Sequence, residues 1–296
     1  MSFKSGFVSV VGKANVGKST LINTLVGEKV AIVSPKPQTT RNKILGILNE
    51  EDYQIIFIDT PGMHKAKNKL DEVMDKSIGE SMQGVDVLVI VLDGSKKIRP
   101  DDVEFVKKYD KSNTILVVSK IDDTTFNKLY PQLAVFNDLK NIKDIIPLSS
   151  FNGKNIDVLL EKIKEKLPEG ERYFDEDSYT DKSVKFMVSE IIREKILWKL
   201  NDEIPHGVAV EIVSFKEKKE VAVISANIIC EKQSHKQIII GAKGQMLKEI
   251  GTKSRLEIEK LLGKRVSLDL FVKVREDWRE NGSFVNNLYG DLGELN

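Results

Sequence analysis

Short continuous apolar runs recur along the first half of the chain, and stretches with apolar residues at helical spacing separate most of them. Runs of this length are typical of strands buried on both faces of a sheet. They predict strands at residues 7–11, 44–48, 53–58, 85–92, 114–118 and 145–148. The helical stretches predict helices around 20–25, at 70–82, 101–109 and 156–167, and one more before residue 145. Residues 1–167 are therefore expected to form an α/β domain with a mostly parallel sheet.

The pattern changes after residue 167. Residues 168–182 hold acidic side chains and few aliphatic ones, and we expect them to form an exposed acidic linker. An amphipathic helix is predicted from residue 184 to 200, and alternation predicts strands at 208–215 and 221–230. A short apolar helix, a long helix at 245–262 and a strand at 266–274 follow. This order predicts a second, smaller α+β domain over residues 183–279, with a tail at 280–296.

Composition excludes several classes of protein. The chain has 296 residues, of which 41% are hydrophobic and 31% charged, and its net charge is +1. These values are ordinary for a globular protein of about two domains. The single cysteine, Cys230, excludes an internal disulfide framework. No apolar export segment opens the sequence, and the run at residues 87–92 is too short to cross a bilayer. We therefore expect a cytoplasmic protein.

The first predicted strand leads into a phosphate-binding loop of the form G-x-x-x-x-G-K-[ST]. Glycines let the backbone wrap a phosphate closely, while the loop N–H groups and the helix N-terminus direct positive dipoles at the anion. Lys18 is expected to reach the β- and γ-phosphates, and the Ser19 hydroxyl to hold Mg²⁺. The predicted phosphate-binding residues are Gly12, Lys13, Ala14, Asn15, Val16, Gly17, Lys18, Ser19 and Thr20.

A second cluster follows the strand at 53–58. There Asp59 precedes Thr60, Pro61 and Gly62. A carboxylate at this point suits Mg²⁺ held through water, and the Gly62 N–H suits the γ-phosphate. The polar loop at residues 34–41 lies between these two clusters and contains two prolines, which exclude regular structure.

Asp122 favours guanine over adenine. A carboxylate only accepts hydrogen bonds, and guanine offers N1–H and the N2 amine side by side, whereas adenine presents an acceptor at N1. Lys120 can lay its alkyl stem over the base. The end of the strand at 145–148 places Ser149, Ser150 and Phe151 where backbone N–H groups can meet the guanine O6.

These five motifs resemble those of the translation-factor-related P-loop GTPases. The resemblance implies GTP and GDP as ligands and places Thr39 and Thr40 of the polar loop among the residues that contact the nucleotide. It favours Thr40 over Thr39 as the Mg²⁺ ligand beside Ser19 and Asp59. One position departs from the family pattern, because the fourth motif begins with Ser119 instead of asparagine. The weaker contact predicts roughly threefold to tenfold weaker nucleotide binding.

Met63 follows Gly62, where many small GTPases place a glutamine that orients water. The chain thus resembles GTPases with a hydrophobic substitution there, which implies slow intrinsic turnover. In several of those the residue matching Asn15 helps to bind K⁺, and we carry that role onto Asn15 as a hypothesis. The predicted catalytic residues are Lys18, Thr40, Asn15 and Gly62.

A G-x-x-G turn, Gly241 to Gly244, lies between the short apolar helix and the long one. In KH domains this turn clamps a nucleic-acid backbone, and the groove admits about four unpaired nucleotides. Residues 232–275 also hold 11 Lys and Arg against 4 Asp and Glu. Together with the order of elements, this predicts a type II KH domain that binds single-stranded RNA. The predicted RNA-binding residues are Ile240, Gly241, Ala242, Lys243, Gly244 and Lys248.

The whole chain resembles bacterial GTPases that join such a G domain to a C-terminal KH domain. The resemblance includes residues 4–7, 37–41, 167–170 and 272–279. It implies a monomeric factor that binds the 3′ end of small-subunit ribosomal RNA and assists assembly of the 30S subunit. It also implies peripheral association with the inner membrane. The alternative is a GTPase whose main partner is a protein or a membrane surface, with the KH-like domain as a docking module.

Overall fold

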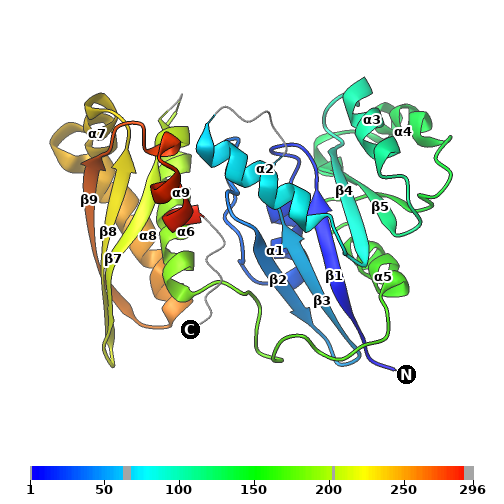
Figure 1. Ribbon diagram of the computed structural model, residues 1–296, viewed down its shortest axis with the longest axis horizontal. Helices are drawn as coiled ribbons and strands as arrows, with labels where there is room; N and C mark the ends of the chain where they lie inside the picture. The colour runs from blue at the N-terminus through cyan, green and yellow to red at the C-terminus, as the bar shows by residue number, and fades with distance from the viewer. Residues whose placement is uncertain (1, 63–67, 202–203, 290–296) are drawn as a thin grey trace. The chain divides into compact units, whose positions relative to one another are not determined.

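The computed structural model describes residues 2–62, 68–201 and 204–289, which form two compact units (Figure 1). The first unit holds residues 2–31, 40–62 and 74–181, and the second holds residues 32–39, 68–73 and 182–289 except 202–203. Among these described residues, no helix is both long and apolar enough to cross a membrane.

The first unit is built on a six-stranded sheet with the order β2-β3-β1-β4-β5-β6. Only β2 runs antiparallel to its neighbour, and the other pairs are parallel. The strands are β1 (Lys4–Val11), β2 (Ile44–Asn49), β3 (Tyr53–Asp59), β4 (Val87–Asp93), β5 (Thr114–Ser119) and β6 (Ile145–Pro147). Strand β4 is buried along most of its length, which explains why its sequence is continuously apolar. The mostly parallel sheet predicted from the apolar runs is thus confirmed.

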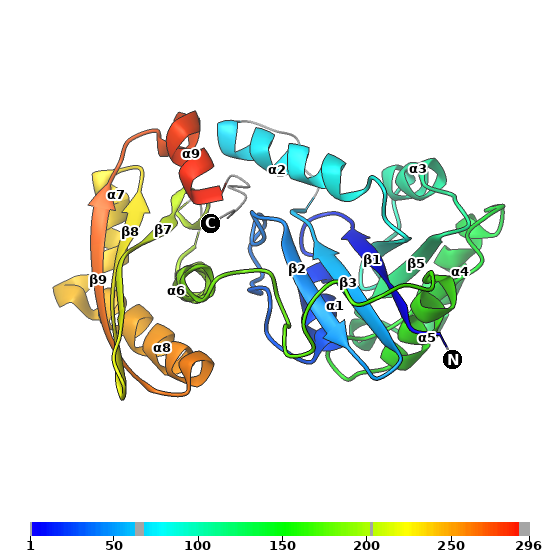
Figure 2. The ribbon, with the colours of Figure 1, turned by 60° about the horizontal axis from the view of Figure 1, so that its bottom comes forward.

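Helices cover both faces of this sheet, with α1 and α5 on one side and α3 on the other (Figure 2). The helices are α1 (Lys18–Val26), α2 (Lys69–Ser81), α3 (Pro100–Lys108), α4 (Phe126–Leu133) and α5 (Ile156–Lys166), and a 3₁₀ turn η1 spans Ile121–Asp123. Strand β1 lies between β3 and β4, so the chain leaves it toward a crevice at the carboxyl edge of the sheet. The phosphate-binding loop occupies that point.

The segment predicted to be an exposed linker, residues 168–182, is bound to the first unit through most of its length. The Ser5 N–H donates to the Pro168 carbonyl at 3.2 Å, and Gly46 and Thr180 form an antiparallel bridge. The buried Gln54 amide donates to the Phe174 carbonyl at 2.8 Å and accepts from the Tyr173 N–H at 2.7 Å. The segment is therefore an extension of the sheet edge as far as residue 181.

The second unit contains a three-stranded sheet with the order β7-β8-β9, in which β7 is antiparallel and β9 parallel to β8. Its elements are α6 (Val184–Lys199), β7 (Ala209–Glu217), β8 (Val221–Cys230), α7 (Gln233–Ile240), α8 (Gln245–Leu262) and β9 (Arg265–Val274). The alternation of β8 places Ala222, Ile224, Ala226 and Ile228 in the core, and each is fully buried. The order α-β-β-α-α-β agrees with the predicted KH-type domain.

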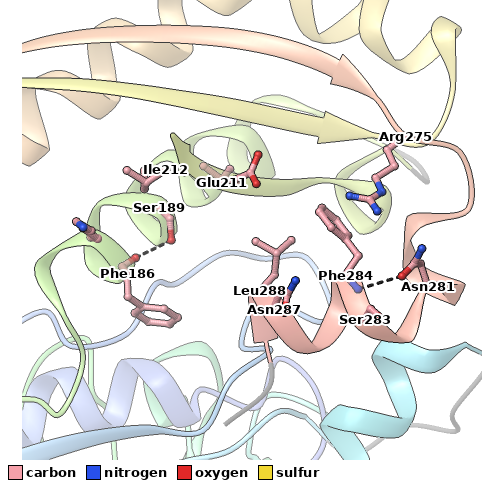
Figure 3. A pocket seen from close by; sticks show the side chains of 12 residues that line it. Phe186, Ser189, Glu211, Ile212, Arg275, Asn281, Ser283, Phe284, Asn287 and Leu288 are labelled. Atoms are coloured by element: carbon pink, nitrogen blue, oxygen red, sulfur yellow. Dashed lines mark hydrogen bonds between the residues drawn. The ribbon is translucent and has the colours of Figure 1, made fainter. Parts of the chain in front are cut away.

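Part of the predicted tail is folded. Residues Gly282–Tyr289 form helix α9, which packs on Trp278, a side chain with no exposed surface. The Trp278 indole donates to the Gly207 carbonyl at 3.0 Å. A cavity of about 630 Å³ lies between α6, β7 and α9, and Figure 3 shows residues that line it. The Arg275 guanidinium lies 3.7 Å from the centre of the Phe284 ring. These aromatic contacts explain how the segment folds without a long apolar run.

Candidate functional site

The phosphate-binding loop depends on two glycines with positive φ. Gly12 has φ 155°, and a Cβ there would stand 2.5 Å from the Val91 carbonyl oxygen. Gly17 has φ 98° and forms the N-cap of α1. No other residue can take these two positions without strain or a backbone clash. The loop N–H groups therefore converge at the start of α1, which is a ready site for an anion.

Lys18 is the first residue of α1, and its side chain is buried. Its ammonium donates to the carbonyls of Gly12 and Lys13, each at 3.1 Å. Burial lowers the pKa of Lys18 to about 8, although the charge of Asp59 opposes the shift. A bound phosphate would supply the negative charge that this buried cation lacks.

The lowered pKa gives nucleotide binding a pH dependence, because phosphates favour the protonated form of Lys18. With a pKa of about 8 in the free protein, the protonated fraction falls about fourfold between pH 7 and pH 8.5. We expect the dissociation constant for Mg·GDP to rise by about the same factor, with uptake of a proton on binding at pH 8.5. Titration calorimetry in two buffers of different ionisation enthalpy measures that uptake. Binding at pH 8.5 without proton uptake would contradict the role of Lys18.

Ser19, Thr40 and Asp59 converge beside Lys18. The Ser19 hydroxyl donates to Asp59 Oδ2 at 2.7 Å and lies 2.8 Å from Thr40 Oγ1, which is 3.3 Å from the same carboxylate oxygen. Burial raises the pKa of Asp59, although the charge of Lys18 and the hydrogen bonds from Ser19 and Thr40 oppose that shift. Asp59 Oδ1 is buried and has no hydrogen-bond partner among the described residues. Two hydroxyls and a carboxylate with a spare oxygen fit a small divalent cation such as Mg²⁺.

Thr39 and Thr40 differ in their surroundings. The Thr39 hydroxyl donates to the Lys36 carbonyl at 2.7 Å and lies 2.7 Å from Ser34 Oγ, whereas Thr40 joins Ser19 and Asp59. Adjacent residues of the same type thus have separate environments, which their positions in the sequence do not reveal.

The Asp59–Gly62 segment lies against the phosphate-binding loop. The Thr60 hydroxyl donates to the Val10 carbonyl at 2.9 Å, and Pro61 is buried. A Cβ on Gly62 would stand 2.6 Å from the Ala14 Cα, so only glycine allows this approach. Met63, the residue expected to replace a water-orienting glutamine, lies outside the described residues.

The predicted base-binding residues lie at the ends of β5 and β6. Asp122 is exposed within η1, and no described residue donates to its carboxylate. Ser149 is buried and its N–H donates to the Lys154 carbonyl, whereas the N–H groups of Ser150 and Phe151 have no acceptor among the described residues. Asp122 and these two N–H groups offer the acceptor and the donors that guanine requires.

Lys120 lies beside the phosphate-binding loop. Its ammonium donates to the Asn15 carbonyl at 2.6 Å and to Asp93 Oδ2 at 2.8 Å. Asp93 was missed from sequence, although it is an acidic residue at the end of a buried strand, as Asp59 is. Burial opposes its ionisation, but the hydrogen bonds from Lys120 and Ser95 outweigh that effect and hold the pKa of Asp93 below its ordinary value. Asp93 thus fixes the Lys120 side chain alongside the loop.

Ser119 still braces the phosphate-binding loop, since its hydroxyl donates to the Val16 carbonyl at 2.6 Å and lies 3.0 Å from that of Leu92. A hydroxyl carries one proton, whereas the asparagine of the family pattern carries two on its amide. We expect Ser119→Asn to tighten GDP binding by about threefold to tenfold, and Ser119→Ala to weaken it. Fluorescent-GDP displacement measures both constants. If Ser119→Asn leaves the affinity unchanged, this account of the position is wrong.

The G-x-x-G turn projects from the second unit between α7 and α8. Gly241 has φ 73°, and a Cβ there would stand 2.7 Å from the Met246 Cβ. Gly244 has φ 77° with open space around it, and Ala242 and Lys243 are exposed. Lys243 and Lys248 form no ion pair among the described residues. The turn therefore presents unpaired positive charge where a polyanion can approach the backbone.

The apolar side of this turn is formed by isoleucines of α7, among them the predicted RNA-binding residue Ile240. Ile240 is only partly buried and packs against the core of the second unit. Ile238 is 49% exposed, so it is the isoleucine of α7 that is more open to a ligand. Three consecutive isoleucines gave no sequence signal to separate them.

Sequence comparisons cover both units. A family described as "50S ribosome-binding GTPase" matches residues 7–120, and a family described as "KH domain" matches residues 203–279. The chain is 49% identical to "GTPase Era" of Clostridioides difficile, over 98% of this chain and 99% of the relative. It is 48% identical to "GTPase Era" of Clostridium acetobutylicum, over 99% and 97%.

Structural comparisons agree. A crystal structure of Era in complex with MgGDPNP and nucleotides 1506–1542 of 16S ribosomal RNA matches with a TM-score of 0.92. It is 39% identical, over 97% of this chain and 99% of that one. An Era variant from Aquifex aeolicus bound to GDP·AlF₄⁻ matches with the same score, identity and coverage. The similarity extends over nearly the full length of each protein, and the chain belongs to the Era family of GTPases.

Proposed function

We propose that this chain hydrolyses GTP to GDP and phosphate and binds the 3′ end of 16S-type ribosomal RNA, so that it assists 30S subunit assembly as a GTP/GDP switch. One observation carries the proposal: the same chain contains two sites. The first is the buried Lys18 beside Ser19, Thr40 and Asp59, and the second is the exposed, cationic G-x-x-G turn. The Era complex with MgGDPNP and 16S RNA, similar over 97% of this chain, supports the same pair of ligands.

Each residue of the GTP site has a separate role in binding or hydrolysis. The ammonium of Lys18 stabilises charge on the β- and γ-phosphates, and the Gly62 N–H donates to the γ-phosphate. Ser19, Thr40 and Asp59 hold the Mg²⁺ site, and the ion when bound neutralises phosphate charge. Asp122 selects guanine, and the N–H groups of Ser150 and Phe151 meet its O6. No glutamine follows Gly62, so we expect slow intrinsic turnover.

A monovalent cation is a further part of this proposal. Asn15 lies in the phosphate-binding loop with φ 61°, and its carbonyl accepts from Lys120. Its side-chain amide oxygen would help to hold K⁺ beside the phosphates. We expect GTP hydrolysis to be faster in K⁺ than in Na⁺ at equal ionic strength, and Asn15→Ala to remove the difference. Equal phosphate-release rates of the unaltered protein in the two salts would end this part of the proposal.

Binding of a short RNA that matches the 3′ end of 16S ribosomal RNA tests the RNA function. The affinity is measured with a non-hydrolysable GTP analogue and with GDP at one salt concentration. Gly244→Asp is the sharper variant, because its carboxylate has open space and repels a phosphate, and because aspartate tolerates the positive φ of 77° better than most residues do. A side chain at Gly241 would also collide with Met246. Loss of binding in Gly244→Asp and weaker binding in Lys243→Ala support the proposed site, and no binding by the unaltered protein would overturn it.

A protein or membrane surface as the main partner is the second candidate, favoured by the exposed Ile238 on α7. The salt dependence of the binding affinity distinguishes RNA from a protein or membrane surface as the main partner. Contacts to phosphates weaken steeply as the salt concentration rises, and apolar contacts do not. Peripheral membrane association belongs to this candidate, and flotation with vesicles in high salt tests it.

A further inference from the structure

The segment 32–39, which ends one residue before Thr40, packs with α6 as part of the second unit. The Val33 N–H donates to Glu194 Oε1 at 2.9 Å, and the Val33 carbonyl accepts from the Trp198 indole at 2.8 Å. The Thr39 carbonyl accepts from the Arg193 guanidinium. Three side chains of one helix therefore bind both ends of this segment.

The same segment also contacts residues that follow the Asp59–Gly62 motif. The Gln38 amide donates to Asp71 Oδ1 at 2.8 Å, and Asp71, in the first turn of α2, is buried. Residues 68–73 are likewise grouped with the second unit. Segments 32–39 and 68–73, which adjoin the GTP motifs, are thus in contact with each other within the second unit.

The α6 residues involved are charged and buried. Arg193 is 1% exposed and forms an ion pair with the buried Glu190, with Nε to Oε1 at 2.7 Å. Glu194 is 4% exposed. Buried charges are costly and add little net stability even when paired. Such a cluster against a loop therefore points to a role other than stability alone.

Alpha-helix α6 is joined in turn to α8, the helix that starts directly after Gly244. Glu194 Oε2 accepts from Lys195 at 2.6 Å, and the Lys195 ammonium also pairs with Glu257 of α8. Lys199 pairs with Glu249 of α8 at 2.5 Å. A continuous series of contacts therefore leads from Thr39, the residue beside Thr40, through α6 to the helix that supports the RNA-binding turn.

We propose that Glu194 and Trp198 of α6 are positioning residues that couple the GTP site to the G-x-x-G turn. The Thr39–Thr40 peptide bond links a hydroxyl at the Mg²⁺ site to a carbonyl held by α6. A change in the position of Thr40 with nucleotide state therefore acts on α6, and α6 acts on α8. The inference rests on the proposed function, because it names the residues through which that switch operates.

The test is the ratio of RNA affinities with a GTP analogue and with GDP, measured for the unaltered protein and for four variants. Trp198→Phe keeps a ring but removes the N–H that binds Val33, and Glu194→Ala removes the acceptor of the Val33 N–H. Glu194→Gln keeps an oxygen acceptor. Arg255→Gln is the control, because it breaks an ion pair within α8 that does not involve segment 32–39.

Reciprocal coupling between two ligands is typically worth about 5-fold to 150-fold in affinity. We expect the ratio to move toward one, by about fivefold or more, in Glu194→Ala and Trp198→Phe. Glu194→Gln should retain more of the ratio, and Arg255→Gln should retain all of it. A defect of folding alone would weaken binding with both nucleotides and leave the ratio unchanged.

The outcomes separate two failures. If the unaltered protein binds RNA equally with either nucleotide, the switch itself is absent and the proposed function fails. If the unaltered protein shows a ratio that both Glu194→Ala and Trp198→Phe retain, the switch stands and the role of α6 is overturned. Trp198 is 59% exposed, so its variant tests the inference even if a change at the buried Glu194 prevents folding.

Discussion

Replacing Lys18 with alanine is expected to lower the GTP hydrolysis rate by about a thousandfold, in the range found for losing a preorganised charge in a catalytic site. The change removes the cation that faces the β- and γ-phosphates. It also removes the charge that opposes the burial-driven rise in the pKa of Asp59, so this carboxylate is less often ionised. A protonated Asp59 is a poor ligand for Mg²⁺. The single change therefore weakens two parts of the site at once.

Phosphate release under single-turnover conditions, with Mg²⁺ varied, measures both effects. The matched control is Lys13→Ala in the same loop, because Lys13 turns away and pairs with Asp101 and Asp102 at 2.5 and 2.6 Å. Because these ion pairs hold the Lys13 side chain, we expect only its backbone to contact a phosphate, and its variant should lose less than about threefold in rate. Equal losses in the two variants would show that general charge, and not the position of Lys18, governs the rate.

The second large effect is expected at Asp122. Changing it to asparagine replaces one acceptor by a donor that faces the N1–H and N2 amine of guanine. Loss of a hydrogen bond to a charged group costs about 1.5–3 kcal/mol, or roughly 10-fold to 150-fold in GTP affinity. Xanthine carries a carbonyl oxygen in place of the N2 amine, so xanthosine triphosphate should bind the variant better than GTP does.

Competition between the two triphosphates for the Asp122→Asn variant checks the exchange of specificity. Asp123→Asn is a suitable control, because Asp123 neighbours Asp122 in η1 and is also exposed. If the Asp122 variant keeps its preference for GTP, another group selects the base.

The elements near the GTP motifs could be predicted because each motif follows an apolar strand, and parallel strands bring their carboxyl ends to one edge. The different roles of Thr39 and Thr40 could not be predicted, because two adjacent threonines differ only in the residues that pack against them in the folded chain. Asp93 belongs to no short motif, and its role appears only when β4 and β5 lie side by side. The sequence therefore predicted which motifs meet at the GTP site, and the structure was needed to show which side chains contact one another there.

The second unit shows a similar limit. Helical periodicity identified the apolar face of α6 but gave Glu190, Arg193 and Glu194 no buried role, since charged residues are expected on a solvated face. Arg193 and Glu194 are buried where they bind segment 32–39, which is distant in sequence, and Glu190 is buried as the ion-pair partner of Arg193. Helix α9 was missed for a related reason, because its few aromatic side chains are stabilised by Trp278 and not by a periodic pattern of their own.

The attachment of residues 168–181 bears on how the chain can be divided. A fragment cut at Leu167, where the helical pattern ends, would strip the Gln54 amide of its partners at Tyr173 and Phe174 and uncover the edge strand β2 beside Thr180. Exposed strand edges promote association between chains. A fragment that extends through Asp181 keeps the edge of β2 covered. The first unit is therefore best expressed alone with residues 168–181 included.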